Sequence, residues 1–319
     1  MNKILILGRI PPPNGGVTVH VSRLLDALEQ REPDYFEFID FRKKPFKAFL
    51  QLLRYQVVHL HSSSPYLQVV VAFVCKLLGK KAMITFHGNM GRYGIRKNVA
   101  VKLAVRLSFI PVVLNAGSLQ KAGKLNKRAI QISAFISSSI CTELNPQLLE
   151  KLHRFRKKHE FLFCTNAWKL TFDKHGNETY GISGIIHNLE KTTQAGLIIS
   201  DPSGSYKAYI QNIFGVIPGN VFIISGQHDF RNVLPFCDAF IRNTTTDGDS
   251  LSVHEAMEQH VIVFASDCVM RPAACRLFSD IEVVDFVGEL RLSPSLKNAG
   301  SDHHEDAVET LLNLYKTHL

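Results

Sequence analysis

The sequence has 319 residues, which suits two domains better than one, and its 45% apolar and 20% charged residues are typical of a soluble globular protein. The 37 Lys and Arg residues outnumber the 28 Asp and Glu residues, and the resulting charge of +9 favours anionic partners such as phosphates or a membrane surface. The longest apolar run, Val69–Leu78, is interrupted by Lys76 and is too short to span a bilayer.

Short apolar runs and helical patterns alternate through the first half of the chain. After a strand pattern at Lys3–Leu7, Val17–Leu28 repeats apolar residues at the spacing of an amphipathic helix. Strands that alternate with helices imply parallel pairing and βαβ units. The further strands are predicted at Phe36–Ile39, Val57–Leu60, Ala82–Phe86 and Pro111–Leu114, and the further helices at Leu67–Leu78 and Val99–Leu107.

A second series of the same kind follows a charged helical pattern at Pro146–His159. The chain therefore reads as two α/β halves, residues 1–140 and 141–319, joined near a serine-rich segment at 133–143. Ligands of open α/β sheets bind at the carboxyl ends of the strands, so we expect a site in a crevice between the halves. The strands are predicted at Phe161–Thr165, Gly196–Ser200, Val221–Ile224, Ala239–Ile241, Val261–Ala265 and Ile281–Val284, and the helices at Ser205–Phe214, Ser252–Gln259 and His304–Thr317.

The cysteines and the N-terminal sequence indicate a cellular location. None of the six cysteines forms a CxxC pair and most lie in apolar runs, which favours buried, reduced thiols and a reducing compartment. The first residues lack the long apolar segment and cleavage site of a signal peptide. We therefore expect a cytoplasmic protein.

Three polar segments follow predicted strands of the first half. Gly15 and Gly16 precede a helix, where paired glycines allow close approach of an anion, although a tight turn explains them equally well. His59 and His61 end one strand and His87 follows the next. A single histidine is more often structural, but histidines in successive strand-end loops favour a site. We expect no metal there, because no carboxylate or cysteine accompanies them at ligand spacing.

The densest polar segment runs from Arg242 to Ala256, after a buried strand and into a helix. Ser252 and Glu255 have capping-box spacing, which is a structural explanation for Glu255 but not for the polar residues before it. Backbone N–H groups at the start of this helix are suited to phosphate, and the carboxylates of Asp247 and Glu255 are suited to sugar hydroxyls.

This segment resembles the signature of glycosyltransferase family 4. In that signature an acidic residue is followed, after seven positions, by Glu and Ala-Met, and then by a strand that ends in Ala-Ser. Here Asp247 precedes Glu255 in this way, and Val261–Asp267 supplies the strand. The segment Leu234–Phe240 is similar to the family's entry into the preceding strand. Three N-terminal motifs match in order: Gly15-Gly16 with His20, Val57–His61 and Thr85–Gly88.

The resemblance covers most of the chain and implies a GT-B fold, in which two Rossmann-like domains face each other across a cleft. It implies an acceptor-side N-terminal domain and a C-terminal domain that binds a nucleotide-sugar donor, leaving open that the last helix packs back on the N-terminal domain. The family is mostly retaining and needs no bound metal or other cofactor. The segments Asp247–Val253 and Arg271-Pro272 look like a branch found in bacterial surface-polysaccharide synthesis.

The resemblance also implies roles for individual residues. Glu255 would hold the nucleotide ribose, while Asp247 and His87 would act on the transferred sugar. The amides of Gly248, Asp249, Ser250 and Leu251 would face the diphosphate and sugar, and Gly15 and Gly16 would approach the diphosphate from the other domain.

Two departures from the family pattern concern charge at this site. Asp247 stands where the family usually has the longer Glu. The family's Gly-Arg…Lys-Gly clamp for the diphosphate is replaced by Asn166–Lys169 and Tyr180-Gly181, so we assign its role to Lys169 and Arg271.

Two basic amphipathic segments, Phe41–Arg54 and Arg96–Arg106, lie in the half that this fold uses for the acceptor. They favour peripheral attachment to the anionic inner face of the cell membrane and a lipid-linked saccharide acceptor, and two ordinary surface helices are the alternative. A nucleic-acid partner is not expected, because no recognised motif accompanies the basic residues.

Three functions remain open on the sequence. The first is transfer of a sugar from a nucleotide sugar to a saccharide acceptor in cell-surface polysaccharide synthesis, such as capsule or lipopolysaccharide. The second is a GT-B-fold sugar-nucleotide epimerase. The third is a non-catalytic sugar-nucleotide-binding subunit, which the missing clamp favours.

Overall fold

A computed structural model describes residues 3–12, 15–138, 141–292 and 306–318 of the chain. The chain divides into two compact units. The first unit comprises Met1–Ser137, Asp247–Ser250 and His304–Leu319, and the second comprises Ser138–Thr246 and Leu251–His303.

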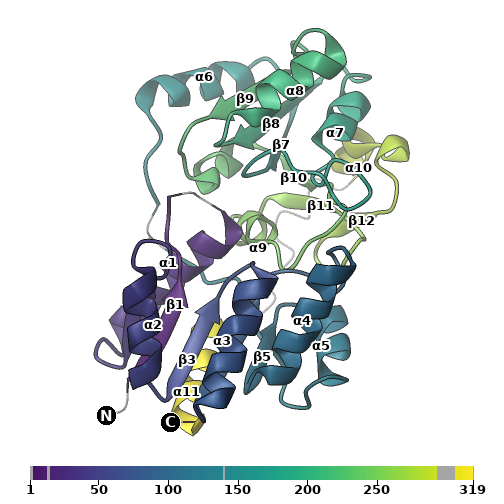
Figure 1. The fold of residues 1–319 in the computed structure, drawn as a ribbon. Coiled ribbons are helices and arrows are strands. Elements are labelled where there is room, and N and C mark those ends of the chain that lie inside the picture. The colour runs from purple at the N-terminus through teal and green to yellow at the C-terminus, as the bar shows by residue number, and fades with distance from the viewer. Residues whose placement is uncertain (1–2, 13–14, 139–140, 293–305, 319) are drawn as a thin grey trace. The chain divides into compact units, whose positions relative to one another are not determined.

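The first unit is built on a six-stranded parallel sheet (Figure 1). Its strands are β1 (Ile4–Gly8), β2 (Phe36–Asp40), β3 (Val57–His61), β4 (Lys81–Phe86), β5 (Ile110–Val113) and β6 (Ile130–Gln131). They pair in the order β2-β1-β3-β4-β5-β6. Because helices cover both faces of such a sheet, its inner strands are apolar on both sides, and β1 and β3 are buried at every position.

Helices from both ends of the chain cover one face of this sheet. The helices of the first unit are α1 (Gly16–Arg31), α2 (Pro45–Arg54), α3 (Pro65–Leu77), α4 (Ile95–Leu107), α5 (Ala116–Gly123) and α11 (Ala307–His318). Side chains of β1 alternate between the two faces: Ile4 and Ile6 share one cluster with α1 and α11, and Leu5 shares the other with α2 to α5. Burying Leu311 of α11 contributes about 2 kcal/mol, so the docked last helix stabilises the first unit substantially.

The second unit repeats the architecture. Its strands are β7 (Phe161–Asn166), β8 (Ala195–Asp201), β9 (Val221–Ser225), β10 (Ala239–Arg242), β11 (Ile262–Ser266) and β12 (Arg276–Phe278). They form a second six-stranded parallel sheet in the order β12-β11-β10-β7-β8-β9. The order reverses direction beside β7 and β10, and such a point is where open α/β sheets bind their ligands.

Helices cover both faces of the second sheet as well. They are α6 (Pro146–Arg156), α7 (Ile182–Leu189), α8 (Ser205–Phe214), α9 (Leu251–Glu258) and α10 (Phe286–Leu292), with short 3-10 turns η1 (Phe230–Asn232), η2 (Leu234–Phe236) and η3 (Ile281–Val283). One hydrophobic cluster joins α7, α8 and α10 to the sheet, and a second joins α6 and α9 to its other face.

The predicted α/β class with two parallel sheets is confirmed. The strand predicted at Ile281–Val284 is wrong, because that segment forms the turn η3. Val283 is 79% exposed, so its apolar side chain does not mark a buried strand, and β12 takes the edge of the sheet instead. The first two residues of the helix predicted at His304–Thr317 lie outside the described residues, and the described helix begins at Ala307.

Candidate functional site

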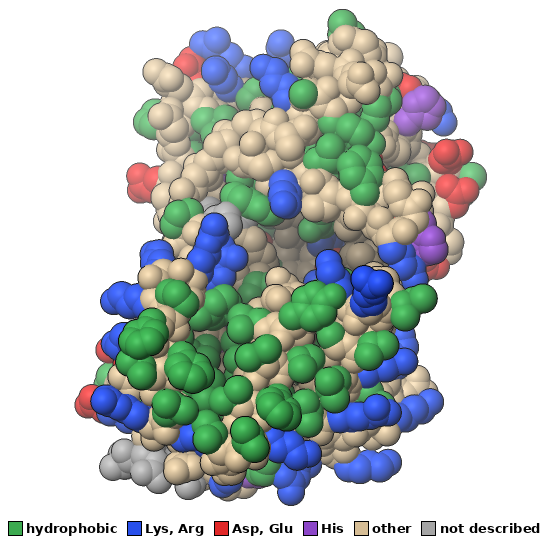
Figure 2. Space-filling view, in the orientation of Figure 1, with side chains coloured by type: hydrophobic (Ala, Val, Ile, Leu, Met, Phe, Trp, Pro, Cys, Tyr) green, Lys and Arg blue, Asp and Glu red, His purple; other side chains and the backbone are tan. Residues whose placement is uncertain are grey.

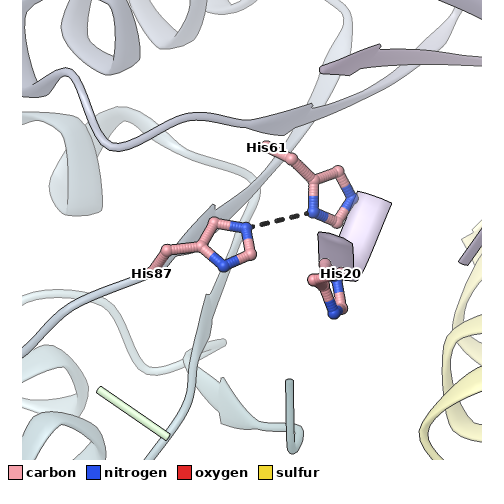
Figure 3. Close-up of side chains that lie close together, drawn as sticks. All are labelled: His20, His61 and His87. Carbon is pink, nitrogen blue, oxygen red and sulfur yellow. Dashed lines mark hydrogen bonds between the residues drawn. The ribbon is translucent and has the colours of Figure 1, made fainter. Parts of the chain in front are cut away.

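Three histidines of the first unit lie together at the carboxyl end of its sheet (Figure 3). His61 is the last residue of β3, His87 follows β4 directly, and His20 comes from the second turn of α1. One ring nitrogen of each lies within 4.8 Å of those of the other two. Nδ1 of His61 and Nε2 of His87 are 3.3 Å apart.

The surrounding hydrogen bonds fix some of these rings. Nδ1 of His20 lies 2.7 Å from the carbonyl oxygen of Ala134, and because a carbonyl only accepts, this nitrogen carries the proton. The fourth histidine, His59, bonds the Tyr315 hydroxyl through Nδ1 and the Thr85 hydroxyl through Nε2. Nε2 of His20 and Nε2 of His61 are buried and have no hydrogen-bond partner among the described residues.

Burial lowers the pKa values of all four imidazoles. Burial lowers the pKa of His20 to about 4, although the carbonyl of Ala134 and the charge of Asp249 raise it in part. Burial lowers the pKa of His59 to about 3. Burial and the neighbouring histidines hold the pKa values of His61 and His87 well below the usual range.

The loop Asp247–Ser250 belongs to the first unit by its contacts and lies against His87. A Cβ atom on Gly248 would come within 3.1 Å of the His87 carbonyl oxygen, so glycine permits this close approach. The Asn115 amide donates to the Gly248 carbonyl at 2.9 Å. A carboxylate oxygen of Asp249 accepts from the backbone N–H of Ala134 at 2.9 Å, and Ser133 Oγ lies 2.6 Å from the same oxygen. The structure thus brings His87, Gly248 and Asp249 together.

Gly15 and Gly16 lie at the start of α1. The Gly15 N–H donates to the Thr18 hydroxyl, and that hydroxyl donates back to the Gly15 carbonyl, each at 2.9 Å. A Cβ atom on Gly16 would meet nothing within 4 Å, so packing within the described protein does not demand glycine there. Pro13 and Asn14 of the same loop lie outside the described residues.

In the second unit, polar side chains gather where β7 and β10 end and α9 begins. The Asn166 amide at the end of β7 donates to the Ser252 hydroxyl at 2.6 Å, and its carbonyl group accepts from Arg242 at 3.3 Å. The guanidinium of Arg242, the last residue of β10, lies 4.8 Å from the ring centre of Tyr180. Glu255 lies in α9 and is 6% exposed. This edge of the sheet therefore combines a buried cation, a buried acid and amide groups.

The structure favours a different role for Ser252 from that of a helix cap. Because α9 begins at Leu251, Ser252 lies inside the helix, and its hydroxyl accepts from Asn166. Ser250 precedes the helix, and its buried hydroxyl has no hydrogen-bond partner among the described residues. Asp247 is half-buried, and its carboxylate accepts from the N–H of Gly248 at 3.1 Å.

The two cations expected to neutralise a diphosphate occupy other parts of the second unit. Lys169 is exposed in the segment after β7. Arg271 is half-buried and donates to the carbonyl of Ser266 at the end of β11, at 3.2 Å. Their roles at a diphosphate remain predictions.

Comparison with solved structures identifies the fold. HepE from Anabaena, solved with UDP and glucose, matches with a TM-score of 0.73 and 14% identity over 99% of both chains. Sucrose-phosphate synthase from Thermosynechococcus elongatus matches with a TM-score of 0.68 and 12% identity over 99% of both chains. The trehalose-6-phosphate synthase OtsA matches with a TM-score of 0.65 and 11% identity over 98% of this chain and 96% of its own. The chain has the GT-B fold. No protein-family model and no curated protein sequence matches it.

Sequence reasoning on this GT-B chain did not select three of the polar residues described above. His20 is selected from the sequence only through a family motif, because its position within a helical pattern does not indicate that its side chain belongs to a polar site. Asn166 and Arg242 lie in polar segments named above, but the sequence predicts no role for either residue. Each is the last residue of a buried strand, and that position is the signal that identifies them.

Proposed function

We propose that the chain transfers a sugar from a nucleotide sugar to a saccharide acceptor. The observation that carries the proposal is the group formed by Asn166, Arg242 and Ser252 at the carboxyl edge of the second sheet, with the buried Glu255 further along the same helix α9. The fold likeness to HepE, which was solved with UDP, supports a nucleotide ligand. Two further structures with this fold are named as synthases of disaccharide phosphates, which supports joining of sugars.

Glu255 is assigned to the nucleotide ribose. A buried carboxylate accepts two hydrogen bonds at once, which suits the paired hydroxyls of a ribose. An ionised carboxylate makes hydrogen bonds worth about twice those between neutral groups.

Arg242 is assigned to the diphosphate, in place of the missing family clamp. Its guanidinium is held by the ring of Tyr180 and the carbonyl group of Asn166 at the end of a parallel strand. A guanidinium fixed in this way offers several donors to phosphate oxygens at little cost in side-chain entropy. Amides at the start of α9 add donors, and Lys169 and Arg271 are proposed as further cations. Such a site neutralises the leaving diphosphate without requiring a metal for the transfer.

His87 and Asp247 are assigned to the transferred sugar. Because burial keeps the pKa of His87 well below its usual range, the ring is neutral and offers one N–H donor to a sugar hydroxyl or carbonyl acceptor. The close contact between Gly248 and the His87 backbone keeps that loop beside the ring. We propose a transfer with retention of configuration, as in the family that the sequence resembles.

The acceptor is proposed to be lipid-linked, because the first unit carries an unusual apolar face. Twelve large apolar residues have exposed side chains here, eleven on α2, α3 and α4 and Leu78 directly after α3, including Phe46 at 74%, Leu77 at 74% and Ile95 at 85%. Figure 2 shows apolar side chains gathered on this side of the first unit, with Lys and Arg around them. Exposed apolar patches of this kind mark interaction sites. The twelve are Phe46, Phe49, Leu50, Leu53, Tyr66, Val70, Phe73, Leu77, Leu78, Ile95, Val99 and Leu103.

The charge of the apolar face formed by α2, α3 and α4 fits an anionic membrane. The helices α2, α3 and α4 contain Lys and Arg and no acidic residue. Basic residues near a membrane surface each contribute about 1 kcal/mol of attraction to anionic lipids. None of the helices in the described parts of the chain has the length and hydropathy needed to cross a bilayer. We therefore propose a cytoplasmic protein that binds the inner face of the cell membrane peripherally and acts in surface-polysaccharide synthesis.

Sedimentation with lipid vesicles tests the membrane part of the proposal. Vesicles that contain phosphatidylglycerol are expected to bind the protein at low salt, and pure phosphatidylcholine vesicles much less. The double variant Phe73→Glu, Leu77→Glu is expected to lose binding, whereas Val216→Glu, at an exposed apolar position in the second unit, is the matched control. Equal binding by both variants, or no binding by the wild type, rejects the membrane assignment.

A donor-panel assay tests the catalytic part. Release of nucleoside diphosphate from a series of nucleotide sugars is measured with and without a membrane extract that supplies acceptors. Release that depends on the extract supports transfer. Conversion of one nucleotide sugar to another without the extract supports an epimerase instead, and binding without either reaction supports a non-catalytic subunit.

A further inference from the structure

The histidine group of the first unit has a feature that sugar binding does not explain. His20 is 2% exposed, and its Nε2 has no partner among the described residues. Buried polar atoms are nearly always bonded, so an unbonded one indicates a missing water or ion.

We propose that His20, His61 and His87 form a binding site for a divalent transition-metal ion, with Zn²⁺ as the best-fitting ion. The site shares His87 with the proposed sugar transfer, since a metal on Nε2 leaves the Nδ1–H to donate to the sugar, and it requires no metal step in that reaction. It also departs from the sequence-based expectation of no metal, which considered only the strand-end histidines and lacked His20 as a third ligand.

The spacing of the nitrogens supports this site. Zinc binds histidine nitrogens at about 2.0–2.1 Å in tetrahedral geometry, which places two ligand nitrogens about 3.3 Å apart. Nδ1 of His61 and Nε2 of His87 are 3.3 Å apart. The full set of three nitrogens lies within 4.8 Å, so small ring movements bring His20 into the coordination distance.

The hydrogen bond of His20 also supports it. Metals bind an imidazole nitrogen that carries no proton. His20 donates its Nδ1 proton to the Ala134 carbonyl, which leaves the lone pair of Nε2 available. A metal-binding histidine commonly has this arrangement, with its other nitrogen bonded to a backbone carbonyl.

Charges of both signs lie near the three histidines. Asp249 favours a bound cation, and its carboxylate accepts from the N–H of Ala134, whose carbonyl accepts from His20. The positive charges of Arg23 and Arg92 oppose it. Three nitrogen ligands suit Zn²⁺ better than Mg²⁺ and Ca²⁺, which prefer oxygen ligands.

Titration of the untagged full-length protein with Zn²⁺, and separately with Co²⁺, tests the proposal. We expect one equivalent to bind after treatment with a chelator, and bound Co²⁺ to show the visible absorption of a tetrahedral complex. Replacement of a ligand in His20→Gln or His87→Gln is expected to weaken binding at least about 100-fold. Because His87 is only half-buried, the His87→Gln variant is expected to fold.

Two control variants keep the test specific. His153→Gln and His175→Gln each remove an exposed histidine of the second unit, outside the ligand set. Both are expected to bind one equivalent with wild-type affinity. The proposal is overturned if the wild type binds less than a stoichiometric amount, or if His20→Gln and His87→Gln bind as well as the controls. These outcomes do not depend on whether the protein transfers sugars.

Discussion

The hydroxyl of Tyr315 lies 2.5 Å from Nδ1 of His59, across 256 positions of sequence. This bond joins the last helix to the middle of the first sheet. His59 in turn bonds Thr85 and stacks on His61, with ring centres 4.1 Å apart. The last helix therefore supports the histidine group as well as the hydrophobic core.

Tyr315→Phe is expected to lower the free energy of unfolding by about 1–2 kcal/mol, because it leaves Nδ1 of the buried His59 without its partner. Urea unfolding at pH 7.5 measures the change. Tyr66→Phe, at a tyrosine that is 53% exposed, serves as the control and is expected to change little. Equal unfolding curves for the two variants would show that the bond does not contribute.

Stability is expected to fall between pH 6.5 and pH 4. The pKa of His20 is about 4 and that of His59 about 3 in the folded chain, against 6.5 when unfolded. The unfolded chain therefore binds more protons in this range, and acid favours it. Each of the two histidines lowers the free energy of unfolding by about 2–3 kcal/mol at pH 4.5 relative to pH 7.5.

Urea unfolding of the chelator-treated protein at pH 7.5 and pH 4.5 measures this loss. Carboxylates also titrate there, so the informative quantity is the difference between variants. His59→Gln is expected to reduce the loss by about 2–3 kcal/mol, whereas the exposed His175→Gln leaves it unchanged. If both variants lose as much stability as the wild type, His59 is not buried in its neutral form.

Arg242→Ala is expected to weaken UDP binding by about 10- to 100-fold, the size of a lost charged hydrogen bond to phosphate. Binding of UMP, which lacks the second phosphate, should weaken less. Isothermal titration with both nucleotides gives the comparison. Arg291→Ala removes another arginine of the second unit that stacks on an aromatic ring, Phe161, and is the matched control. A parallel loss for UDP and UMP would contradict the diphosphate assignment.

His87→Gln is expected to slow sugar transfer about 100-fold or more while UDP affinity stays within about threefold. The physical reason is that the ring is assigned to the sugar and not to the nucleotide. Steady-state kinetics and UDP titration separate the two effects, and the exposed His153→Gln is the control. Loss of UDP affinity with an unchanged turnover number would move His87 away from the sugar.

Much of the fold follows from the sequence because parallel strands are buried on both faces. Strands such as β3 and β8 therefore read as uninterrupted apolar runs. A clear period of apolar residues needs several turns or residues, which the short helices α5, α7 and α10 and the two-residue strand β6 do not have. The false strand at Ile281–Val284 shows that a short apolar run is ambiguous, since only tertiary contacts decide its burial.

The candidate site followed from the sequence where a strand end supplied the signal, as for His61 and His87. This strand-end signal could not identify His20, because its neighbours, Ala134 and the strand-end histidines, come from distant segments. The contacts of the Asp249 carboxylate with Ser133 and Ala134 were not predicted either, while the role of its backbone amide stays a prediction. Such long-range contacts depend on how helices pack on the sheet, which local pattern does not determine.

Transfer of a labelled sugar is the most direct measurement of the central claim. The donor that releases nucleoside diphosphate is supplied with an isotope in its sugar, and label in the saccharide or lipid fraction of the membrane extract is counted. We expect wild-type protein and Glu258→Gln, at an exposed position of α9, to transfer label, and Glu255→Gln to lose transfer while it remains folded by circular dichroism. Transfer by Glu255→Gln at the wild-type rate, or no transfer by the wild type from any nucleotide sugar, would contradict the account.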